Sequence, residues 1–152
     1  MIRILFVCHG NICRSPMAEF VMKELVRRAG LQAQIQVASA ATSTEEIGNP
    51  VYPPAREKLR QHGISCQGKQ AVQLRRADYD RYDYLIGMDR WNMRNMLRIV
   101  GRDPEGKLRP LLPDREVADP WYTGDFDATW NDVLEGCQAL LDELRRSGRL
   151  SS

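Results

Sequence analysis

Residues 8–15 of this 152-residue chain place a thiol, a guanidinium and a hydroxyl close together, as Cys8, Arg14 and Ser15. A cysteine thiolate is a strong nucleophile. The planar guanidinium of arginine donates hydrogen bonds in a geometry that matches two phosphate oxygens. A serine hydroxyl can donate a hydrogen bond to the sulfur. These residue types in this order predict a loop that holds a tetrahedral dianion over an attacking sulfur.

The elements that flank the loop would direct its backbone at one point. The apolar run 2–7 predicts a buried central strand, and the amphipathic pattern over about residues 16–29 predicts a helix that ends at Gly30. The loop then lies at a helix N-terminus, where free N–H groups and the helix dipole attract anions. Gly10 lets the backbone curl closely around an anion, and the same positive field favours the thiolate of Cys8.

The rest of the chain alternates between strand and helix patterns. Further strands are predicted over about residues 35–38, 84–88 and 107–112, and further helices over about 53–62, 90–100 and 125–146, with a helical turn within 74–82. This alternation predicts a parallel sheet with helices on both faces, whose loops gather at the carboxyl edge of the strands. A polar loop is expected from Ser39 to about Val51.

Two helix faces follow from the periodicity. On the helix over residues 16–29, Glu19 falls with the other charged residues on the outer face. On the helix over residues 90–100, the apolar residues predict an inward face, made of Trp91, Met96, Leu97 and Val100.

A departing oxygen needs an acid, and the loop contains none. Candidates follow the fourth predicted strand: Asp114, Asp119, Asp125 and Asp127. Asp119 stands out because Pro120 holds it extended, and because Trp121 and Tyr122 follow it. Asp–Pro is also a common turn, so the residues alone leave a purely structural role for Asp119 open.

The composition narrows the class of protein. With 43% hydrophobic and 28% charged residues, the chain fits one globular domain over residues 1–152. A net charge of +2 gives no reason to expect nucleic acid as a partner, and no apolar stretch approaches the length of a membrane span. No leader segment is expected before the loop. The cysteines suit reduced thiols in the cytoplasm; they are Cys8, Cys13, Cys66 and Cys137.

Residues 7–19, Val-Cys-His-Gly-Asn-Ile-Cys-Arg-Ser-Pro-Met-Ala-Glu, resemble the signature of the low-molecular-weight protein tyrosine phosphatases, and the likeness continues through 39–40, 84–89 and 119–122. The resemblance implies an α/β fold with an open four-stranded parallel sheet, flavodoxin-like or Rossmann-like, in the order 2-1-3-4. It implies a cytosolic enzyme without metal or other cofactor that hydrolyses phosphotyrosine in proteins through a phosphocysteine intermediate. We expect a monomer or a weak dimer, with no nucleic-acid or membrane partner.

The same resemblance assigns roles to single residues. Cys8 is the nucleophile, Arg14 binds the phosphoryl group and Asp119 is the general acid, while Trp121 and Tyr122 form a wall for the substrate ring. The other members of the phosphate-binding loop are His9, Gly10, Asn11, Ile12, Cys13 and Ser15. We expect Asn11 to clip the loop's own backbone rather than touch substrate.

Cys13 has two interpretations. It either fills the floor of the loop or, as the resemblance implies, acts as a redox guard that forms a disulfide with oxidised Cys8.

Two segments depart from the family pattern. Residues 44–47, Thr-Glu-Glu-Ile, stand where many relatives carry an aromatic wall, and we expect Glu45 or Glu46 to disfavour acidic peptides. Lys69 stands in place of a usual histidine, which puts in doubt the hydrogen-bond network that supports the loop through Ser39.

Three alternative functions stay open. Protein-arginine phosphatases resemble the chain but prefer threonine at the position of Ile12. The larger isoleucine would narrow the pocket and favour an aryl phosphate. Thioredoxin-linked arsenate reductases need a redox cysteine pair downstream, and Cys66 and Cys137 are far apart in sequence. A phosphopeptide-binding protein or redox sensor without activity is the third.

Overall fold

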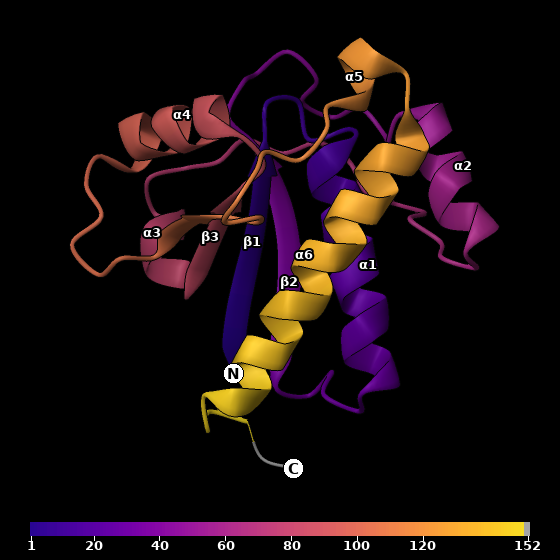
Figure 1. The fold of residues 1–152 in the computed structure, drawn as a ribbon. Coiled ribbons are helices and arrows are strands. Elements are labelled where there is room, and N and C mark those ends of the chain that lie inside the picture. The colour runs from indigo at the N-terminus through magenta and orange to yellow at the C-terminus, as the bar shows by residue number, and fades with distance from the viewer. Residues whose placement is uncertain (151–152) are drawn as a thin grey trace.

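A four-stranded parallel sheet forms the centre of the protein (Figure 1). The structure is a computed structural model that describes residues 1–150. The strands are β1 (Ile2–Cys8), β2 (Ile35–Ala41), β3 (Tyr84–Gly87) and β4 (Leu108–Pro110), in the order β2-β1-β3-β4. The predicted fold class and strand order are therefore confirmed.

β2 is longer than predicted. It pairs with β1 along its whole length, from Ile2 opposite Ile35 to Cys8 opposite Ala41. The prediction that a loop begins at Ser39 is wrong, because pairing with β1 overrides the weak strand preference of the small residues 38–41. This extension places Ser39 in the sheet beside the end of β1.

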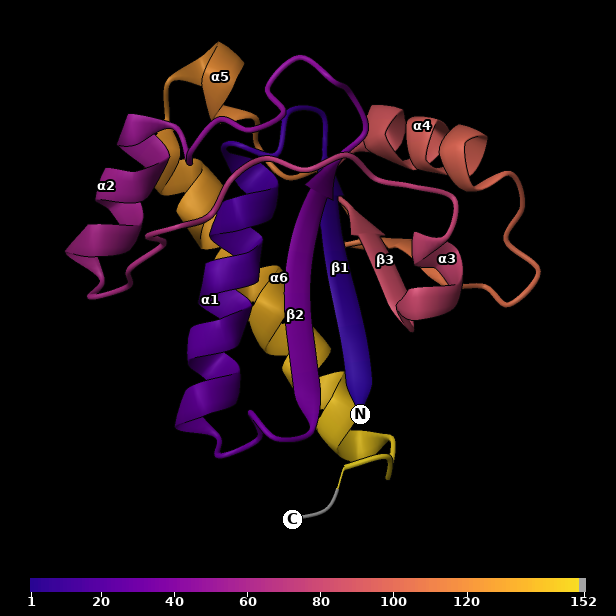
Figure 2. The ribbon, with the colours of Figure 1, turned by 180° about the vertical axis from the view of Figure 1, so that it is seen from behind.

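Helices cover both faces of the sheet (Figures 1 and 2). They are α1 (Arg14–Arg28), α2 (Pro53–Gln61), α3 (Asp78–Arg81), α4 (Arg90–Val100), α5 (Pro120–Thr123) and α6 (Phe126–Arg146). α1, α2 and α6 lie on one side and α3 and α4 on the other. The sequence did not predict α5, which has only four residues. None of the helices within residues 1–150 is long and apolar enough to cross a membrane.

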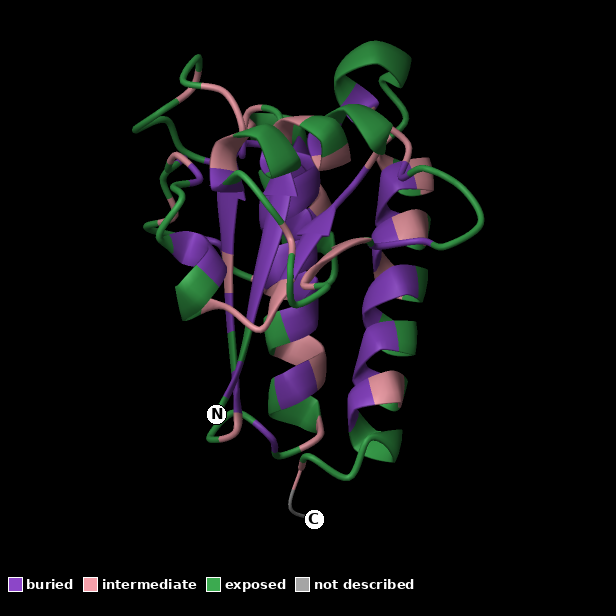
Figure 3. Cartoon of the chain, turned by 90° about the vertical axis from the view of Figure 1, so that its left-hand side faces the viewer, coloured by how far each residue is buried: buried purple, intermediate pink, exposed green. Residues whose placement is uncertain are grey.

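β1 supplies apolar side chains to both layers of the core. Ile4 and Phe6 pack toward α1 and α6, in a cluster with Met17. Leu5 and Val7 point the other way and pack toward α4. Figure 3 shows the sheet buried between its helix layers. Because both faces of β1 are covered, its carboxyl end is held firmly where the reactive loop begins.

The predicted inward face of α4 is partly wrong. Met96 and Val100 are buried, but the third buried position of the helix is Asn92, whereas Trp91 and Leu97 are 56% and 45% exposed. Asn92 Oδ1 accepts hydrogen bonds from the N–H groups of residues 88 and 89 at 3.0 and 3.2 Å. These bonds satisfy the buried amide, so the polar residue occupies an inward position that periodicity assigned to apolar ones.

A close approach between α6 and the segment after β4 brings residues 111–119 to the carboxyl edge of the sheet. A Cβ on Gly136 would lie 2.4 Å from Leu111 Cγ, so only glycine allows this contact. Along the same segment, Val117 N–H donates to Met88 O at 2.9 Å. The chain thus passes over the end of β3 directly before Asp119.

Candidate active site

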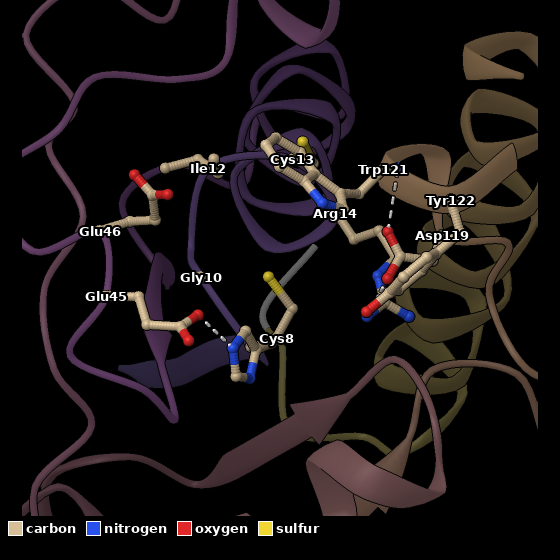
Figure 4. Close-up of a pocket in the computed structure, with 11 residues that line it drawn as sticks. Cys8, Gly10, Ile12, Cys13, Arg14, Glu45, Glu46, Asp119, Trp121 and Tyr122 are labelled. Carbon is tan, nitrogen blue, oxygen red and sulfur yellow. Dashed lines mark hydrogen bonds and ion pairs between the residues drawn. The ribbon is translucent and has the colours of Figure 1, made fainter. Parts of the chain in front are cut away.

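A cavity of about 260 Å³ opens at the carboxyl end of β1 (Figure 4). The loop between β1 and α1 forms its floor, and residues 45–46 and 119–122 form its sides. The lining residues are Cys8, His9, Gly10, Ile12, Cys13, Arg14, Glu45, Glu46, Asp119, Trp121 and Tyr122. No side chain caps the start of α1 at Arg14, so the first N–H groups of that helix are available to an anion.

The sulfur of Cys8 is paired with a hydroxyl. Cys8 Sγ lies 3.0 Å from Ser15 Oγ, and Asn11 Nδ2 donates to the same oxygen at 2.7 Å. Because Asn11 occupies the acceptor side of Ser15, the hydroxyl proton of Ser15 is free to point at the sulfur. A thiolate at Cys8 would be stabilised by that bond.

Asn11 contacts neighbouring segments and not the loop's own backbone, so the expected clip is wrong. Its Nδ2 donates to Ser39 Oγ at 2.9 Å, and its Oδ1 accepts from Val72 N–H at 3.1 Å. Asn11 has a φ of 59°, in the left-handed region that asparagine tolerates better than most residues. This backbone turns the amide away from the cavity and toward β2.

A buried ion pair continues this network behind the loop. Ser39 Oγ donates to Glu19 Oε1 at 2.6 Å, while Lys69 Nζ donates to Ser39 O at 2.9 Å and lies 3.6 Å from Glu19 Oε1. Burial lowers the pKa of Lys69 below its ordinary value, and Glu19 opposes that shift. The supporting network is therefore present, with lysine in it.

The outer-face placement of Glu19 is wrong, because this side chain is only 4% exposed. A carboxylate can be buried in the protein interior when positively charged groups and hydrogen-bond donors surround it. Ser39 and Lys69 meet that need, and Lys23 adds a bond at 2.5 Å. No pattern within one helix could have indicated partners that lie 20 and 50 residues away.

Arg14 is 4% exposed and is held by two carboxylates. Its Nη1 lies 2.8 Å from Asp89 Oδ2, and its Nη2 lies 3.3 Å from Asp119 Oδ2. Burial disfavours the charged guanidinium, but Cys8, Asp119 and Asp89 outweigh it and raise the pKa of Arg14. The guanidinium is thus fixed in a charged state at the cavity floor.

Asp89 has no role in the chemistry that is predicted from the sequence. It is the N-cap of α4, where its Oδ1 accepts from Asn92 N–H at 2.8 Å, and its other oxygen binds Arg14. One signal could have indicated it, namely an acidic residue at the carboxyl end of a predicted strand and directly before a helix.

Only one of the four candidate aspartates reaches the cavity. Asp119 Oδ1 accepts from Trp121 N–H at 3.1 Å, and Oδ2 faces Arg14. The other three are engaged elsewhere: Asp114 with Arg115, Asp125 as the N-cap of α6 and Asp127 with Lys58.

The two sides of the cavity differ in chemistry. On one side Trp121 is 57% and Tyr122 85% exposed, and the ring of Tyr52 lies 5.1 Å from that of Trp121. On the other side His9 Nε2 lies 2.6 Å from Glu45 Oε2 (Figure 4). The site can therefore accept a flat apolar group against its aromatic side and an anion at its floor.

All four cysteines are free thiols. Cys13 is buried together with Ile12 and Ala71, and burial raises the pKa of its thiol to about 12. Cys66 follows α2, and Cys137 is buried in α6, where its sulfur faces Ala18 O at 3.7 Å. Cys13 alone shares the cavity with Cys8.

Comparison with known proteins agrees with this site. Residues 3–150 match the family described as "Low molecular weight phosphotyrosine protein phosphatase". The chain is 38% identical to the low molecular weight protein-tyrosine-phosphatase YfkJ of Bacillus subtilis, over 99% of this chain and all of that protein. It is 36% identical to the low molecular weight phosphotyrosine protein phosphatase of Rattus norvegicus, over 92% of this chain and 94% of that one.

Solved structures show the same likeness. The crystal structure of YfkJ matches with a TM-score of 0.93 at 37% identity, over 97% of both chains. That of the low molecular weight protein tyrosine phosphatase from Streptococcus pyogenes matches with a TM-score of 0.88 at 39% identity, over 95% of this chain and 93% of that one. The sequence, the fold and the cysteine at the floor of the cavity together show that this chain belongs to the low molecular weight phosphotyrosine protein phosphatase family and is a cysteine-dependent phosphatase.

Proposed function

We propose that this phosphatase cleaves phosphotyrosine in proteins with Cys8 as nucleophile, Arg14 as phosphate ligand and Asp119 as general acid. One observation carries the proposal: the buried guanidinium of Arg14 lies between Asp89 and Asp119 at the floor of the cavity that also contains Cys8. A fixed cation beside a thiol is the arrangement that phosphoryl transfer to sulfur requires.

The reaction has two steps. In the first, the Cys8 thiolate attacks phosphorus, the bond from phosphorus to the tyrosine oxygen breaks, and Asp119 gives its proton to that oxygen. In the second, Asp119 takes a proton from water while the water oxygen attacks phosphorus, the phosphorus–sulfur bond breaks, and phosphate leaves. Arg14 and the N–H groups at the start of α1 stabilise the charge on the other three oxygens in both steps.

The aromatic side of the cavity supports an aryl phosphate as substrate. Trp121 and Tyr122 offer ring faces to the tyrosine, and Tyr52 packs against Trp121 from outside the cavity lining. Ile12 adds an apolar side chain near the floor. A phosphotyrosine peptide should therefore be hydrolysed much faster than the same peptide carrying phosphoarginine.

The role of Asp119 predicts a dependence on the leaving group. Asp119→Asn should lower kcat/KM, which reports on the first step alone, by about 10²–10³-fold for phosphotyrosine. The loss should be much smaller for 2,4-dinitrophenyl phosphate, whose phenolate leaves without a proton. Steady-state kinetics on the two substrates measure the difference. Asp114→Asn, a change at an exposed aspartate five residues earlier, should leave both rates unchanged. Equal losses on both substrates would show that Asp119 is not the acid.

We propose that Cys13 protects Cys8 from irreversible oxidation. Peroxide converts the Cys8 thiolate to a sulfenic acid; the Cys13 sulfur then attacks the Cys8 sulfur, the sulfur–oxygen bond breaks, and water leaves with the Cys13 proton. The product is a disulfide that an added thiol reduces. The shared cavity supports this pairing. Burial raises the pKa of Cys13, so its thiol keeps its proton and does not compete with Cys8 as the nucleophile.

The guard role predicts a difference in recovery. After peroxide and then dithiothreitol, the native enzyme should regain most of its activity, whereas Cys13→Ala should stay inactive because Cys8 proceeds to sulfinic acid. Activity assays and intact mass measurements follow both outcomes. Cys66→Ala, which changes a cysteine outside the cavity, should recover like the native enzyme. Full recovery of Cys13→Ala would leave Cys13 with a packing role alone.

We place this activity in the cytoplasm, where free thiols persist. The free state of all four cysteines supports that setting. The exposed rings of Trp121 and Tyr122 suit a monomer or a weak dimer, because a tight dimer through this side would cover the cavity.

A further inference from the structure

The outward face of α4 carries a row of arginines. Arg90, Arg94 and Arg98 are four residues apart, so they lie above one another on the helix. Trp91 and Leu97 flank the row, and all five residues fall within about a third of the helix circumference. We call these five residues the α4 basic face. All five residues are exposed, and Figure 3, which is seen from the side of the molecule that carries α3 and α4, shows exposed stretches on the helices of that side.

The row has no acidic partner within residues 1–150, where no ion pair involves its three guanidinium groups. The carboxylate of Glu116 accepts from the backbone N–H of Arg90 at 2.7 Å and not from its guanidinium. Arginines on other helices differ, since Arg27 and Arg60 pair with glutamates of their own helix. The whole chain has a net charge of only +2, so this row is a local excess of positive charge.

Two of the three arginines in the row pack against an aromatic ring. The guanidinium carbons of Arg90 and Arg94 lie 5.9 and 5.6 Å from the ring centroid of Trp91. These contacts reduce the freedom of the Arg90 and Arg94 side chains, which lowers the entropy lost when they bind a ligand.

The α4 basic face begins beside the active site. Asp89, the residue before Arg90, binds Arg14 at the cavity floor. Figure 1 places α4 at the same end of the sheet as the reactive loop and α5. With a rise of 1.5 Å per residue, the row extends about 12 Å along the helix from Arg90 to Arg98. About four residues of extended peptide cover that length.

We propose that the α4 basic face docks an acidic segment of the phosphoprotein substrate, separated from the phosphotyrosine by several residues. This inference rests on the proposed function. Arginine forks bind carboxylates with two hydrogen bonds each, so a row of three suits a run of aspartates or glutamates. The spacing follows from the cavity itself, because Glu45 and Glu46 repel carboxylates directly beside the phosphotyrosine.

A membrane surface fits the face less well. An interfacial helix needs a continuous apolar stripe, whereas Trp91 and Leu97 lie on opposite edges of the arginine row. The remaining apolar side chains of α4 pack toward the sheet: Met96 and Val100 are buried, and Met93 and Ile99 are partly buried. Charge is therefore what the face offers, and an acidic peptide is what it fits.

The test compares phosphotyrosine peptides that carry a run of about four glutamates or four glutamines, joined to the phosphotyrosine by Gly/Ser linkers of about two, six or ten residues. At low salt the native enzyme should favour the glutamate peptide about 10-fold in kcat/KM at one of the longer spacings, mainly through KM, and should lose this preference in about 0.5 M NaCl. Arg94→Gln/Arg98→Gln should remove the preference. The matched control Arg145→Gln/Arg146→Gln, at the far end of α6, should keep it.

Hydrolysis of p-nitrophenyl phosphate separates this inference from the proposed function. The native enzyme and both double variants should hydrolyse it equally, and an inactive native enzyme would refute the proposed chemistry whatever the peptides show. Equal kcat/KM for the glutamate and glutamine peptides at every spacing would overturn the docking surface. So would a preference that survives in Arg94→Gln/Arg98→Gln. Binding of the native enzyme alone to phosphatidylserine vesicles, with no peptide preference, would assign the face to a membrane and overturn the proposal.

Discussion

Cys8→Ser lowers the turnover of phosphotyrosine by at least about 10⁴-fold while leaving the affinity for inorganic phosphate near that of the native enzyme. A serine hydroxyl stays protonated at neutral pH, and the group that the Cys8 sulfur contacts, the Ser15 hydroxyl, is no base. The anion site survives, because Arg14 and the start of α1 are unchanged by the substitution. Steady-state kinetics give the first quantity, and calorimetric titration with phosphate gives the second.

Trapping the intermediate provides a second measurement of the same prediction. Native enzyme quenched in acid during turnover should carry one phosphoryl group on Cys8 by mass spectrometry, and the serine variant none. Cys66→Ser is the matched control, since Cys66 lies outside the cavity, and it should retain both turnover and label. A serine variant that turns over at the native rate would place the nucleophile elsewhere.

Arg14→Lys is expected to lower kcat/KM by about 10²–10³-fold and to weaken phosphate binding, although the charge is kept. The guanidinium reaches Asp89 and Asp119 through separate nitrogens and still presents a planar edge to a ligand. A single ammonium cannot do both. Kinetics on p-nitrophenyl phosphate and the affinity for inorganic phosphate measure the loss.

Arg109→Lys is the matched control for this substitution. Arg109, in β4, also makes a bidentate contact: its two terminal nitrogens donate to Glu143 of α6 at 2.7 and 2.9 Å. This ion pair lies away from the cavity. This variant should lose only a little thermal stability and keep full activity. If Arg14→Lys behaved in the same way, the guanidinium would serve the fold and not the reaction.

The reactive loop could be predicted from the sequence because its parts are contiguous. Cys8, Arg14 and Ser15 lie within one strand–loop–helix unit, where spacing along the chain determines spacing in space. The sheet could be predicted for a similar reason, since alternating strands and helices allow few topologies. Asp119 stood out because proline and two aromatic residues follow it, and its side chain lines the cavity.

The family resemblance indicated Ser39 as a support of the loop. Its other supports could not be predicted, because each one depends on a contact between distant segments. The pattern of its own helix predicts Glu19 at the surface, but contacts with Ser39 and Lys69 allow it to be buried. The sequence around Asp89 indicates only a helix cap, and its contact with Arg14, 75 residues earlier in the chain, appears only in the fold. Asn92 takes an inward position on α4 for the sake of two backbone N–H groups. In each case tertiary partners, and not periodicity, decide where a polar side chain lies.

A hydrogen-bonded network of side chains connects the nucleophile to the scaffold behind the loop. It runs from Cys8 through Ser15, Asn11 and Ser39 to Glu19. The eight residues that carry the chemistry look like a portable motif, but their shape is imposed by groups on α1 and β2. Grafted onto another strand and helix, they would collapse into a different turn. A transfer of residues 8–15 to another protein would therefore have to include counterparts of Glu19 and Ser39.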